Sequence, residues 1–522
     1  MSNSERSIQI LPHDRQIKTT SGMSLLESLM QKSIFLRSDC GGKGKCGKCR
    51  VHKATGQGGY EIIESCTYTI TEDISIKIPE SSMQSSHIMS KAPVHFPRGF
   101  KDQFSNVEIP DSHGFAVDLG TTTIAIYLCN MAKGEVVSSL AVKNPQAIYG
   151  DDVMSRIGVI GQEPENLGKL QNLVVKSIEW GITELLSSFG DGKNAVSRMV
   201  VVGNPSMIHI LAGVDPESIG ISPYEPVFYD AKHFSSNQLG FGIKDISIQT
   251  LPQVSGFIGG DILAAALAVE FEEQPDGTLL IDLGTNGELL LKNKEQLFAT
   301  SCATGPAFEG ASLSCGMQAI PGAINSVEID SDKKVVRYSI INPVKLSGTK
   351  PSGICGAGVI DSIAQLCEKQ IIAPSGAFRS GEQEFILVPE NKDNGQSIVY
   401  ISQKDIRSVQ LGKSALISGI EFLLKKAGLD TPGKIIIAGA FGSHLNKLDL
   451  IRLGMIPGID LDKIETAGNS AGTGAIMTLC NDQYLDRAQQ MADKIETVDL
   501  ACNIDFQEVF IRNLSFPDEV LN

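Results

Sequence analysis

Three closely spaced cysteines, followed by a fourth, constrain this chain more than any other feature of its sequence. Cys40, Cys46 and Cys49 stand in the spacing C-x5-C-x2-C with glycines in the gaps, and Cys66 follows after sixteen residues. Iron–sulfur clusters need several thiolates that converge on one small core, and glycines let a loop wrap closely around it. Structural zinc sites usually show two C-x2-C pairs, and only one occurs here. Zinc therefore ranks well below an iron–sulfur cluster, and a disulfide framework ranks lower still.

The residues before the cysteines predict two strands and a helix. Residues 7–11 alternate between polar and apolar side chains, as a strand does, and residues 16–20 suit its hairpin partner. Residues 24–32 carry apolar side chains at helical spacing, with Ser21 or Ser24 as the cap. The predicted order is therefore strand, strand, helix and cysteine loop.

This order resembles the start of a β-grasp ferredoxin. Plant-type [2Fe–2S] ferredoxins use C-x4-C-x2-C and a distant fourth cysteine, and the longer first gap here is similar to vertebrate-type and hydroxylating-system ferredoxins. Residues 66–79 alternate again and are predicted to form the closing strand. Related domains usually carry a longer segment before the fourth cysteine, but no other cysteine occurs before Cys129. The resemblance implies a ferredoxin over residues 1–80, whose [2Fe–2S] cluster is bound by Cys40, Cys46, Cys49 and Cys66.

Length and charge exclude several classes of function. A chain of 522 residues is long enough for several domains, and a net charge of −15 argues against a nucleic-acid partner. No apolar run reaches transmembrane length, and the N-terminus lacks the apolar region of a signal peptide. Eleven cysteines without a secretion signal predict a reducing, cytoplasmic location and no membrane partner. Residues 81–112, rich in Ser and Pro, are predicted to be a linker, either a plain tether or a hinge for the ferredoxin.

A second signal is a strand–turn–strand pattern that occurs twice. In each copy an aspartate ends an apolar strand and is followed by Leu-Gly-Thr and a second apolar strand, at residues 114–128 and 278–292. One such turn is a common hairpin, but two copies predict two similar lobes that face each other across a cleft. Carboxylates, hydroxyls and turn amides can hold Mg²⁺ and nucleotide phosphates. A third segment, residues 434–443, is a buried strand that leads into a glycine turn suited to adenine and ribose.

These three elements, in this order, resemble the actin, sugar-kinase and Hsp70 (ASKHA) ATPase superfamily. The resemblance implies ATP and Mg²⁺ as cofactors. It also implies a first phosphate loop, a second phosphate loop and an adenosine motif, at residues 118–123, 282–287 and 439–442. The predicted nucleotide contacts are Gly120, Thr121, Thr122, Thr123, Gly284, Thr285, Asn286, Gly287, Gly439 and Gly442.

A [2Fe–2S] ferredoxin followed by such an ATPase is the layout of the reductive activators of corrinoid proteins. Further stretches resemble that family, namely 144–146, 150–157, 203–209, 305–310, 353–358, 403–407 and 468–474. The resemblance implies an ATP-dependent enzyme that passes an electron from its cluster to Co(II) and regenerates Co(I) for methyl transfer. It also implies a corrinoid protein and an upstream electron donor as partners, and a homodimer through the C-terminal half. The fold expected is α/β and α+β multidomain, with a first ASKHA lobe over 113–275 and a C-terminal lobe over 276–522.

Three aspartates are the candidate catalytic residues. Asp118 and Asp282 each follow an apolar strand, and the matched pair favours Mg²⁺ or water positioning over simple turn capping. Asp261 stands where a glycine-rich turn enters a helix, so a helix N-cap and a residue that orients the attacking water are equally good interpretations.

Other polar residues and other functions rank lower. His209 is better explained as a helix-face histidine than as a corrinoid contact. Cys302, Cys315 and Cys355 are better explained as buried thiols than as ligands of a second cluster, because their spacing is wide. The rival functions are a redox sensor or electron-carrier scaffold without ATP turnover, and a small-molecule kinase with an appended ferredoxin.

Overall fold

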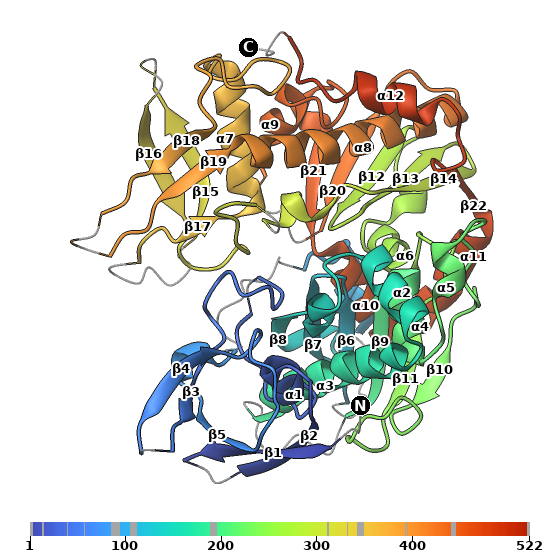
Figure 1. Cartoon of the computed structure of the whole chain (residues 1–522). Helices are drawn as coiled ribbons and strands as arrows, with labels where there is room; N and C mark the ends of the chain where they lie inside the picture. Colours follow the sequence, from blue (N-terminus) through green and yellow to red (C-terminus); the bar gives the residue numbers. More distant parts are fainter. Residues whose placement is uncertain are drawn as a thin grey trace.

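The computed structural model describes residues 4–12, 15–38, 40–56, 58–84, 94–104, 112–187, 196–310, 313–330, 332, 334–341, 349–391, 393, 395–439 and 445–518. Three larger sheets organise the chain (Figure 1): a five-stranded sheet near the N-terminus and two six-stranded sheets after it. None of the helices in these ranges is long and apolar enough to cross a membrane.

The N-terminal sheet has the strand order β2-β1-β5-β3-β4, in which β1 pairs antiparallel with β2 and parallel with β5. Its strands are β1 (Glu5–Leu11), β2 (Arg15–Thr20), β3 (Arg50–Ala54), β4 (Tyr60–Glu64) and β5 (Ile74–Lys77). The predicted strand pair and helix are present, and α1 (Leu25–Met30) is capped by Ser24, whose side chain accepts a hydrogen bond from the Glu27 amide at 3.2 Å. The closing strand is shorter than predicted, because only residues 74–77 pair with β1. The β3–β4 hairpin was not predicted.

The second sheet and the third sheet share one topology, as the repeated hairpin predicts. In the second sheet, β6, β7 and β8 form an antiparallel meander and β9 pairs parallel with β6. In the third, β12, β13 and β14 form the meander and β20 pairs parallel with β12. The second sheet contains β6 (His113–Leu119), β7 (Thr123–Asn130), β8 (Glu135–Lys143), β9 (Val196–Gly203), β10 (His233–Ser235) and β11 (Ser247–Thr250). The third contains β12 (Thr278–Leu283), β13 (Gly287–Asn293), β14 (Gln296–Cys302), β20 (Lys434–Ala438), β21 (Ile464–Gly468) and β22 (Ile495–Thr497).

Helices cover both six-stranded sheets (Figure 1). Those that follow strands of the first lobe are α2 (Val153–Gln162), α3 (Glu165–Ser187), α4 (Pro205–Ala212), α5 (Glu217–Gly220) and α6 (Gly260–Ala268). The C-terminal half adds α7 (Gly356–Glu368), α8 (Gln403–Ala427), α9 (Lys447–Arg452), α10 (Ser470–Cys480), α11 (Gln483–Lys494) and α12 (Phe506–Arg512). It also holds two small sheets, which comprise β15 (Ala323–Ile329), β16 (Val335–Ile340) and β17 (Gly353–Ile354), and β18 (Glu384–Val388) with β19 (Val399–Ser402).

Two helices lie in a core that both lobes share. Buried side chains of α6 and α10 pack in one cluster with Val200 of the second sheet and Leu280 of the third. The two helices cross so closely that a β-carbon on Gly474 would stand 2.0 Å from the Ala264 carbonyl oxygen. Glycine is therefore required at this crossing.

The five-stranded domain packs against the first lobe. Leu173 of α3 belongs to the same buried cluster as Ile8, Leu29 and Ile76, and the Phe35 ring meets the Trp180 ring edge-on at 5.9 Å. The face of α3 therefore serves as part of the core of the N-terminal domain.

Part of the predicted linker is anchored to the lobes. Residues 85–93 and 105–111 lie outside the described residues. Within 94–104, Phe100 is buried and its ring lies 6.1 Å from the Tyr484 ring, and Gln103 donates a hydrogen bond to the Tyr484 hydroxyl at 2.9 Å. These residues do not behave as a plain tether, because they dock on α11.

Candidate functional site

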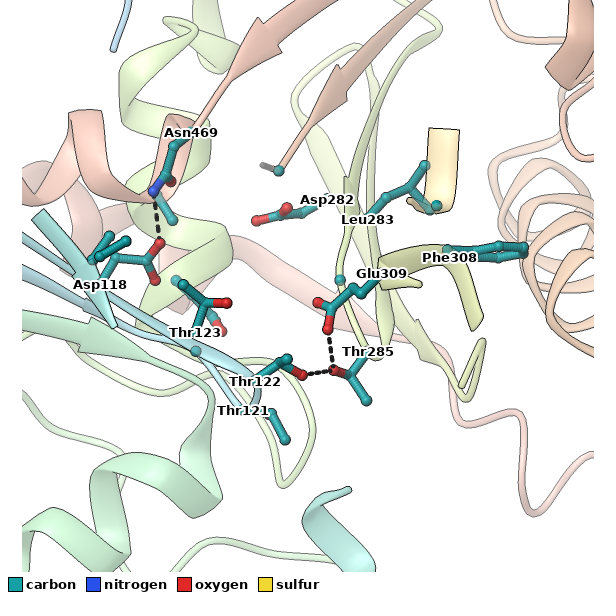
Figure 2. A pocket seen from close by; sticks show the side chains of 18 of the residues that line it. Asp118, Thr121, Thr122, Thr123, Asp282, Leu283, Thr285, Phe308, Glu309 and Asn469 are labelled. Atoms are coloured by element: carbon teal, nitrogen blue, oxygen red, sulfur yellow. Dashed lines mark hydrogen bonds between the residues drawn. The ribbon is translucent and has the colours of Figure 1, made fainter. Parts of the chain in front are cut away.

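The two repeated hairpins meet at one cavity (Figure 2), which nearly all of the predicted nucleotide residues line. In the first hairpin the Gly120 amide donates to the Thr123 carbonyl at 3.0 Å, and a β-carbon on Gly120 would stand 2.6 Å from that oxygen. In the second, the Gly284 amide donates to the Asn286 carbonyl at 2.9 Å. Both turns are tight because glycine allows the backbone to approach itself. The predicted residues that line the cavity are Asp118, Gly120, Thr121, Thr122, Thr123, Asp261, Asp282, Gly284, Thr285, Asn286 and Gly439.

One predicted contact, Gly287, differs from this picture. Gly287 does not line the cavity; it begins β13, where a β-carbon would stand 3.0 Å from Thr304 Cγ2 and 3.3 Å from Leu416 Cδ1. Its function is thus close packing behind the hairpin. Gly442 lies outside the described residues. Gly439 does reach the site, with φ of +96° and a β-carbon position 2.9 Å from Asp282 Oδ1, so a larger residue would push against that carboxylate.

The two lobes touch through side-chain hydroxyls at the cavity. The Thr122 hydroxyl lies 2.8 Å from the Thr285 hydroxyl, which in turn donates to Glu309 Oε2 at 3.1 Å. Figure 2 shows that the two hydrogen bonds meet at the Thr285 hydroxyl, with Thr122 on one side and Glu309 on another. A second contact joins the lobes where the Asn469 amide donates to Asp118 Oδ2 at 2.9 Å.

Helix N-termini surround the same cavity. Asn204 caps α4 and also donates to the Thr121 hydroxyl at 3.0 Å, and Asn469 caps α10. Cys355, the N-cap of α7, lines the cavity as well, together with the first residues of that helix. Because the N-terminal end of a helix carries a partial positive charge and free amides, this arrangement suits the phosphates of a nucleotide.

Five carboxylates reach the cavity, and two of them were not among the predicted site residues. They are Asp118, Asp261, Asp282, Glu288 and Glu309. Glu288 directly follows the second loop and pairs with Asp282 across β12 and β13, so the repeat could have indicated it. Glu309 was part of a matching stretch, but only the fold places it against Thr285.

Burial raises the pKa of all three predicted aspartates. It raises that of Asp118 to about 6 against the hydrogen bond from Asn469, and that of Asp261 to about 7. The pKa of Asp282 rises to about 8, first through burial and then through the negative charges of Asp261, Asp118 and Glu309. Within the described part of the chain, no hydrogen bond reaches the Asp282 carboxylate. Mg²⁺ prefers carboxylate oxygens as ligands and would favour the ionised form of these crowded carboxylates, so the residues fit a magnesium–nucleotide complex.

Asp261 is not the helix cap. The N-cap of α6 is Gly259, and Asp261 lies in the first turn, where its Oδ1 accepts a hydrogen bond from the Ile262 amide at 3.0 Å. Its carboxylate lines the cavity, so the position is compatible with the other interpretation, a residue that orients water.

The four predicted cysteine ligands lie together in the N-terminal domain as two pairs. The Cys49 and Cys66 sulfurs are 3.4 Å apart, and the Cys40 and Cys46 side chains hydrogen-bond to each other. Backbone amides point at these sulfurs, those of Lys43, Lys45 and Cys46 at Cys40 and that of Gly44 at Cys66. The loop adopts this course because Gly41, Gly42, Gly44 and Gly47 all have φ between +60° and +81°.

Two pairs of thiols suit a two-iron cluster better than zinc. A [2Fe–2S] core takes two thiolates on each iron, and amide donors stabilise the sulfur charge. A structural zinc ion needs four ligands around one point. Across the described ranges, no group of three or more His, Cys, Asp or Glu side chains has the geometry to hold one metal ion.

The remaining candidates have structural roles. His209 Nδ1 lies 2.7 Å from the Pro205 carbonyl, its Nε2 accepts from the Val227 amide at 3.0 Å, and its ring stacks on Phe228. It is therefore a satisfied helix histidine, as predicted. Cys302 and Cys355 are buried thiols on separate elements and, among the described residues, do not join Cys315 in a metal-binding group.

These features define an ASKHA-fold protein with an attached cysteine-loop domain, and comparison with known proteins narrows the class. Residues 276–522 match the family description "C-terminal domain of RACo the ASKHA domain", and residues 113–274 match "RACo middle region". The chain belongs to the family of reductive activators of corrinoid proteins. A solved structure of a reductive activator for corrinoid, iron-sulfur protein superposes with a TM-score of 0.72 at 26% identity, over 98% of each chain.

Two relatives of known function carry names that agree with this family assignment. The corrinoid activation enzyme RamQ of Eubacterium limosum is 30% identical over 80% of this chain and 72% of its own length. The [Co(II) methylated amine-specific corrinoid protein] reductase of Methanosarcina barkeri is 26% identical over 77% of each chain. A shorter match is to one component of the Na⁺-translocating NADH-quinone reductase of Klebsiella pneumoniae subsp. pneumoniae, which is 32% identical over 13% of this chain and 20% of its own length.

Proposed function

We propose that this chain is an ATP-dependent reductive activator that returns an inactive Co(II) corrinoid protein to Co(I). The observation that supports it most is the presence, in one chain, of a four-cysteine loop and of two matched hairpins that face each other across one carboxylate-lined cavity. The names of the two relatives that match most of the chain, a corrinoid activation enzyme and a Co(II) corrinoid protein reductase, support the same kind of reaction.

The N-terminal domain supplies the electron in this proposal. Residues 1–80 form a β-grasp ferredoxin in which Cys40, Cys46, Cys49 and Cys66 hold a [2Fe–2S] cluster, which provides one-electron transfer. An upstream electron donor reduces it. The thiol pairing, the amides aimed at the sulfurs and the short match to the quinone-reductase component support this assignment. A thiolate-bound cluster also favours the cytoplasm as the location.

The two lobes bind Mg²⁺-ATP. We assign residues 113–275 and 276–522 as the lobes, with 81–112 as the connection to the ferredoxin. Thr121, Thr122, Thr123, Gly284, Thr285 and Asn286 contact the phosphates, and Gly439 and Gly442 contact the adenosine. Asp118 and Asp282 position Mg²⁺, and Asp261 orients the attacking water. Two observations support these roles. The Thr122 and Thr285 hydroxyls meet between the lobes, and the N-termini of α4 and α10 lie at the cavity.

ATP makes an unfavourable electron transfer possible by changing a population of conformations. Binding between the hairpins replaces the direct Thr122–Thr285 contact by contacts to phosphate, so the relative position of the lobes depends on the nucleotide. A corrinoid protein that prefers one lobe position then responds to ATP. The protein acts as a homodimer through its C-terminal half, which light scattering of the purified protein tests.

One experiment tests the proposed function. Purified protein, a strong reductant, Mg²⁺-ATP and a Co(II) corrinoid protein are mixed, and the visible spectrum is followed. We expect Co(I) to form only when ATP is present. Co(I) formation that proceeds equally without ATP would contradict the proposal and favour a simple electron carrier.

A further inference from the structure

One segment of the first lobe touches both the cysteine loop and the first phosphate hairpin. It comprises residues 143–156, from the last residue of β8 to the first turn of α2, and is called the bridging segment here. All of its residues belong to the described part of the chain.

On one side the bridging segment contacts the cysteine loop. Lys143 Nζ donates to the Ser38 carbonyl at 3.1 Å, two residues before Cys40, and Lys43 forms an ion pair with Asp151. The cysteine loop also packs closely against this segment, since a β-carbon on Gly41 would stand 3.1 Å from Asp151 Oδ1 and 3.3 Å from the Ala147 carbonyl oxygen. Any shift of residues 147–151 must therefore move the loop that carries the cysteines.

On its other side the bridging segment holds the first phosphate hairpin. Asn144 donates two hydrogen bonds to the hairpin: its backbone N–H donates to the Thr122 carbonyl at 2.7 Å, and its side chain donates to the Gly120 carbonyl at 3.0 Å. Arg156 is fully buried, and its guanidinium donates to the Thr121 carbonyl at 2.6 Å and to the Gly150 carbonyl at 3.0 Å. The planar Arg156 guanidinium thus links the phosphate turn at Thr121 to Gly150, the residue before Asp151.

Lys143 connects the two sides most directly. It lies opposite Thr123 in the β7–β8 register, beside the phosphate hairpin, while its amine reaches the Ser38 carbonyl. The positive charge of Lys143 also acts on Glu309, which lines the nucleotide cavity. Burial raises the pKa of Glu309, and the charge of Lys143 is among the interactions that lower it. Glu309 in turn accepts a hydrogen bond from Thr285, and both residues belong to the C-terminal lobe.

We propose that Lys143 and Arg156 are positioning residues that couple nucleotide binding to the cysteine loop through the bridging segment. This inference rests on the proposed function, since it needs a nucleotide between the hairpins and a cluster in the loop. A phosphate between Thr122 and Thr285 moves the first hairpin or changes the charge that Lys143 faces, and the bridging segment passes this change to Ser38, Gly41 and Lys43. Because this loop would hold the cluster, we expect nucleotide binding to change the reduction potential of the cluster, and by reciprocity the oxidation state of the cluster then changes nucleotide affinity.

The test measures nucleotide affinity in two redox states of the full-length, cluster-loaded protein. The dissociation constant of a Mg²⁺-bound, non-hydrolysable ATP analogue is determined by calorimetry with the cluster oxidised and with the cluster reduced by dithionite. We expect the two constants to differ by about fivefold or more in the wild type, the lower end of ordinary coupling. Lys143→Met should bring their ratio close to one, and Lys143→Arg should restore part of it. Lys133→Met is the matched control, because this exposed lysine lies in the turn between β7 and β8, at the other end of β8, and this variant should keep the wild-type ratio.

A second pair keeps the test decisive if Lys143→Met weakens nucleotide binding itself. Lys43→Met and Asp151→Asn cut the ion pair on the cysteine-loop side, away from the cavity, and should lower the ratio without changing affinity in the oxidised state. The two single variants and the double variant should lower the ratio of dissociation constants by the same factor, because each of them removes the same Lys43–Asp151 ion pair. A wild-type ratio of one, or variants that all keep the wild-type ratio, would overturn the inference. A wild type that binds no nucleotide would instead overturn the proposed function.

Discussion

The Thr122 and Thr285 hydroxyls, one from each phosphate hairpin, form a 2.8 Å hydrogen bond across the two lobes. Glu309 completes the contact, because its carboxylate hydrogen-bonds to both hydroxyls and accepts from Thr285 at 3.1 Å. Thr285 directly follows Asp-Leu-Gly in the second hairpin, and Thr122 stands one residue beyond the corresponding position in the first. The contact joins the lobes at the point where the proposed function places the phosphates of ATP.

Removing the Thr285 hydroxyl should impair turnover. Thr285→Val keeps the shape of the side chain but deletes its bonds to Thr122 and Glu309, so kcat/KM for ATP hydrolysis should fall by about tenfold or more, the usual effect of one lost phosphate-positioning donor. Thr278→Val, which deletes a hydroxyl that bonds the Pro275 carbonyl at the other end of β12, is the control. Equal ATPase rates in both variants would show that Thr285 does not contact the nucleotide.

Asp282 should make the nucleotide-free protein less stable as the pH rises. Its pKa is about 8 in the folded protein against an ordinary value of 3.8, so the folded state binds more protons than the unfolded state between these values. The free energy of unfolding should therefore decline from about pH 4 to about pH 8. In Asp282→Asn the decline in melting temperature over this window should be smaller, whereas the exposed-site control Asp230→Asn should follow the wild type. An unchanged slope in Asp282→Asn would mean that this carboxylate is ionised throughout.

The cysteine loop should bind two irons per chain. Cys46→Ala removes one thiolate of the Cys40–Cys46 pair, so the purified variant should lose its brown colour and its electron transfer, while ATP binding persists because the cavity lies between the lobes. Iron, zinc and sulfide analysis and the visible spectrum measure this. Cys502→Ala, at an exposed cysteine outside the loop, should keep the full iron content. One tightly bound zinc and no sulfide in the wild type would refute the cluster.

ATP turnover and cobalt reduction should depend on one another. Asp282→Ala should hydrolyse ATP at least about tenfold more slowly, retain its cluster and accept electrons from dithionite, yet form no Co(I). Asp118→Ala should behave similarly. The measurement is ATP hydrolysis with and without Co(II) corrinoid protein, since a partner that prefers one lobe position must change the rate. If the rate of ATP hydrolysis does not change and Co(I) forms without ATP, the cluster domain and the ATPase domain are not coupled.

Local sequence patterns predicted the site where its residues are contiguous. The two Asp-Leu-Gly-Thr hairpins and the four-cysteine loop are short segments whose glycines and strand alternation determine their conformation, and the structure places Asp118, Asp282 and Thr285 along one cavity. Glu309 could not be assigned a role in this way, because its contact with Thr285 spans two segments of the chain that only the fold brings together.

The same limit applies outside the cavity. The β3–β4 hairpin was not predicted, since its strands are short and its outer strand is half exposed, which leaves little apolar alternation to detect. The sequence also suggested a phosphate contact for Gly287, whereas the structure uses that glycine for packing against Thr304. A glycine in a motif does not reveal by itself which neighbour requires its small size.

The crossing of α6 and α10 restricts how the two lobes can move. These helices share a buried cluster with side chains of both sheets, so pulling the lobes straight apart would expose apolar groups, at about 1.5–3 kcal/mol for each large side chain. Sliding of α10 over α6 keeps the cluster covered, and the bare Gly474 backbone against the Ala264 carbonyl offers no side chain to obstruct it. The nucleotide-driven motion should therefore be a shear of a few ångströms at this crossing, with the widest displacement at the periphery of the lobes.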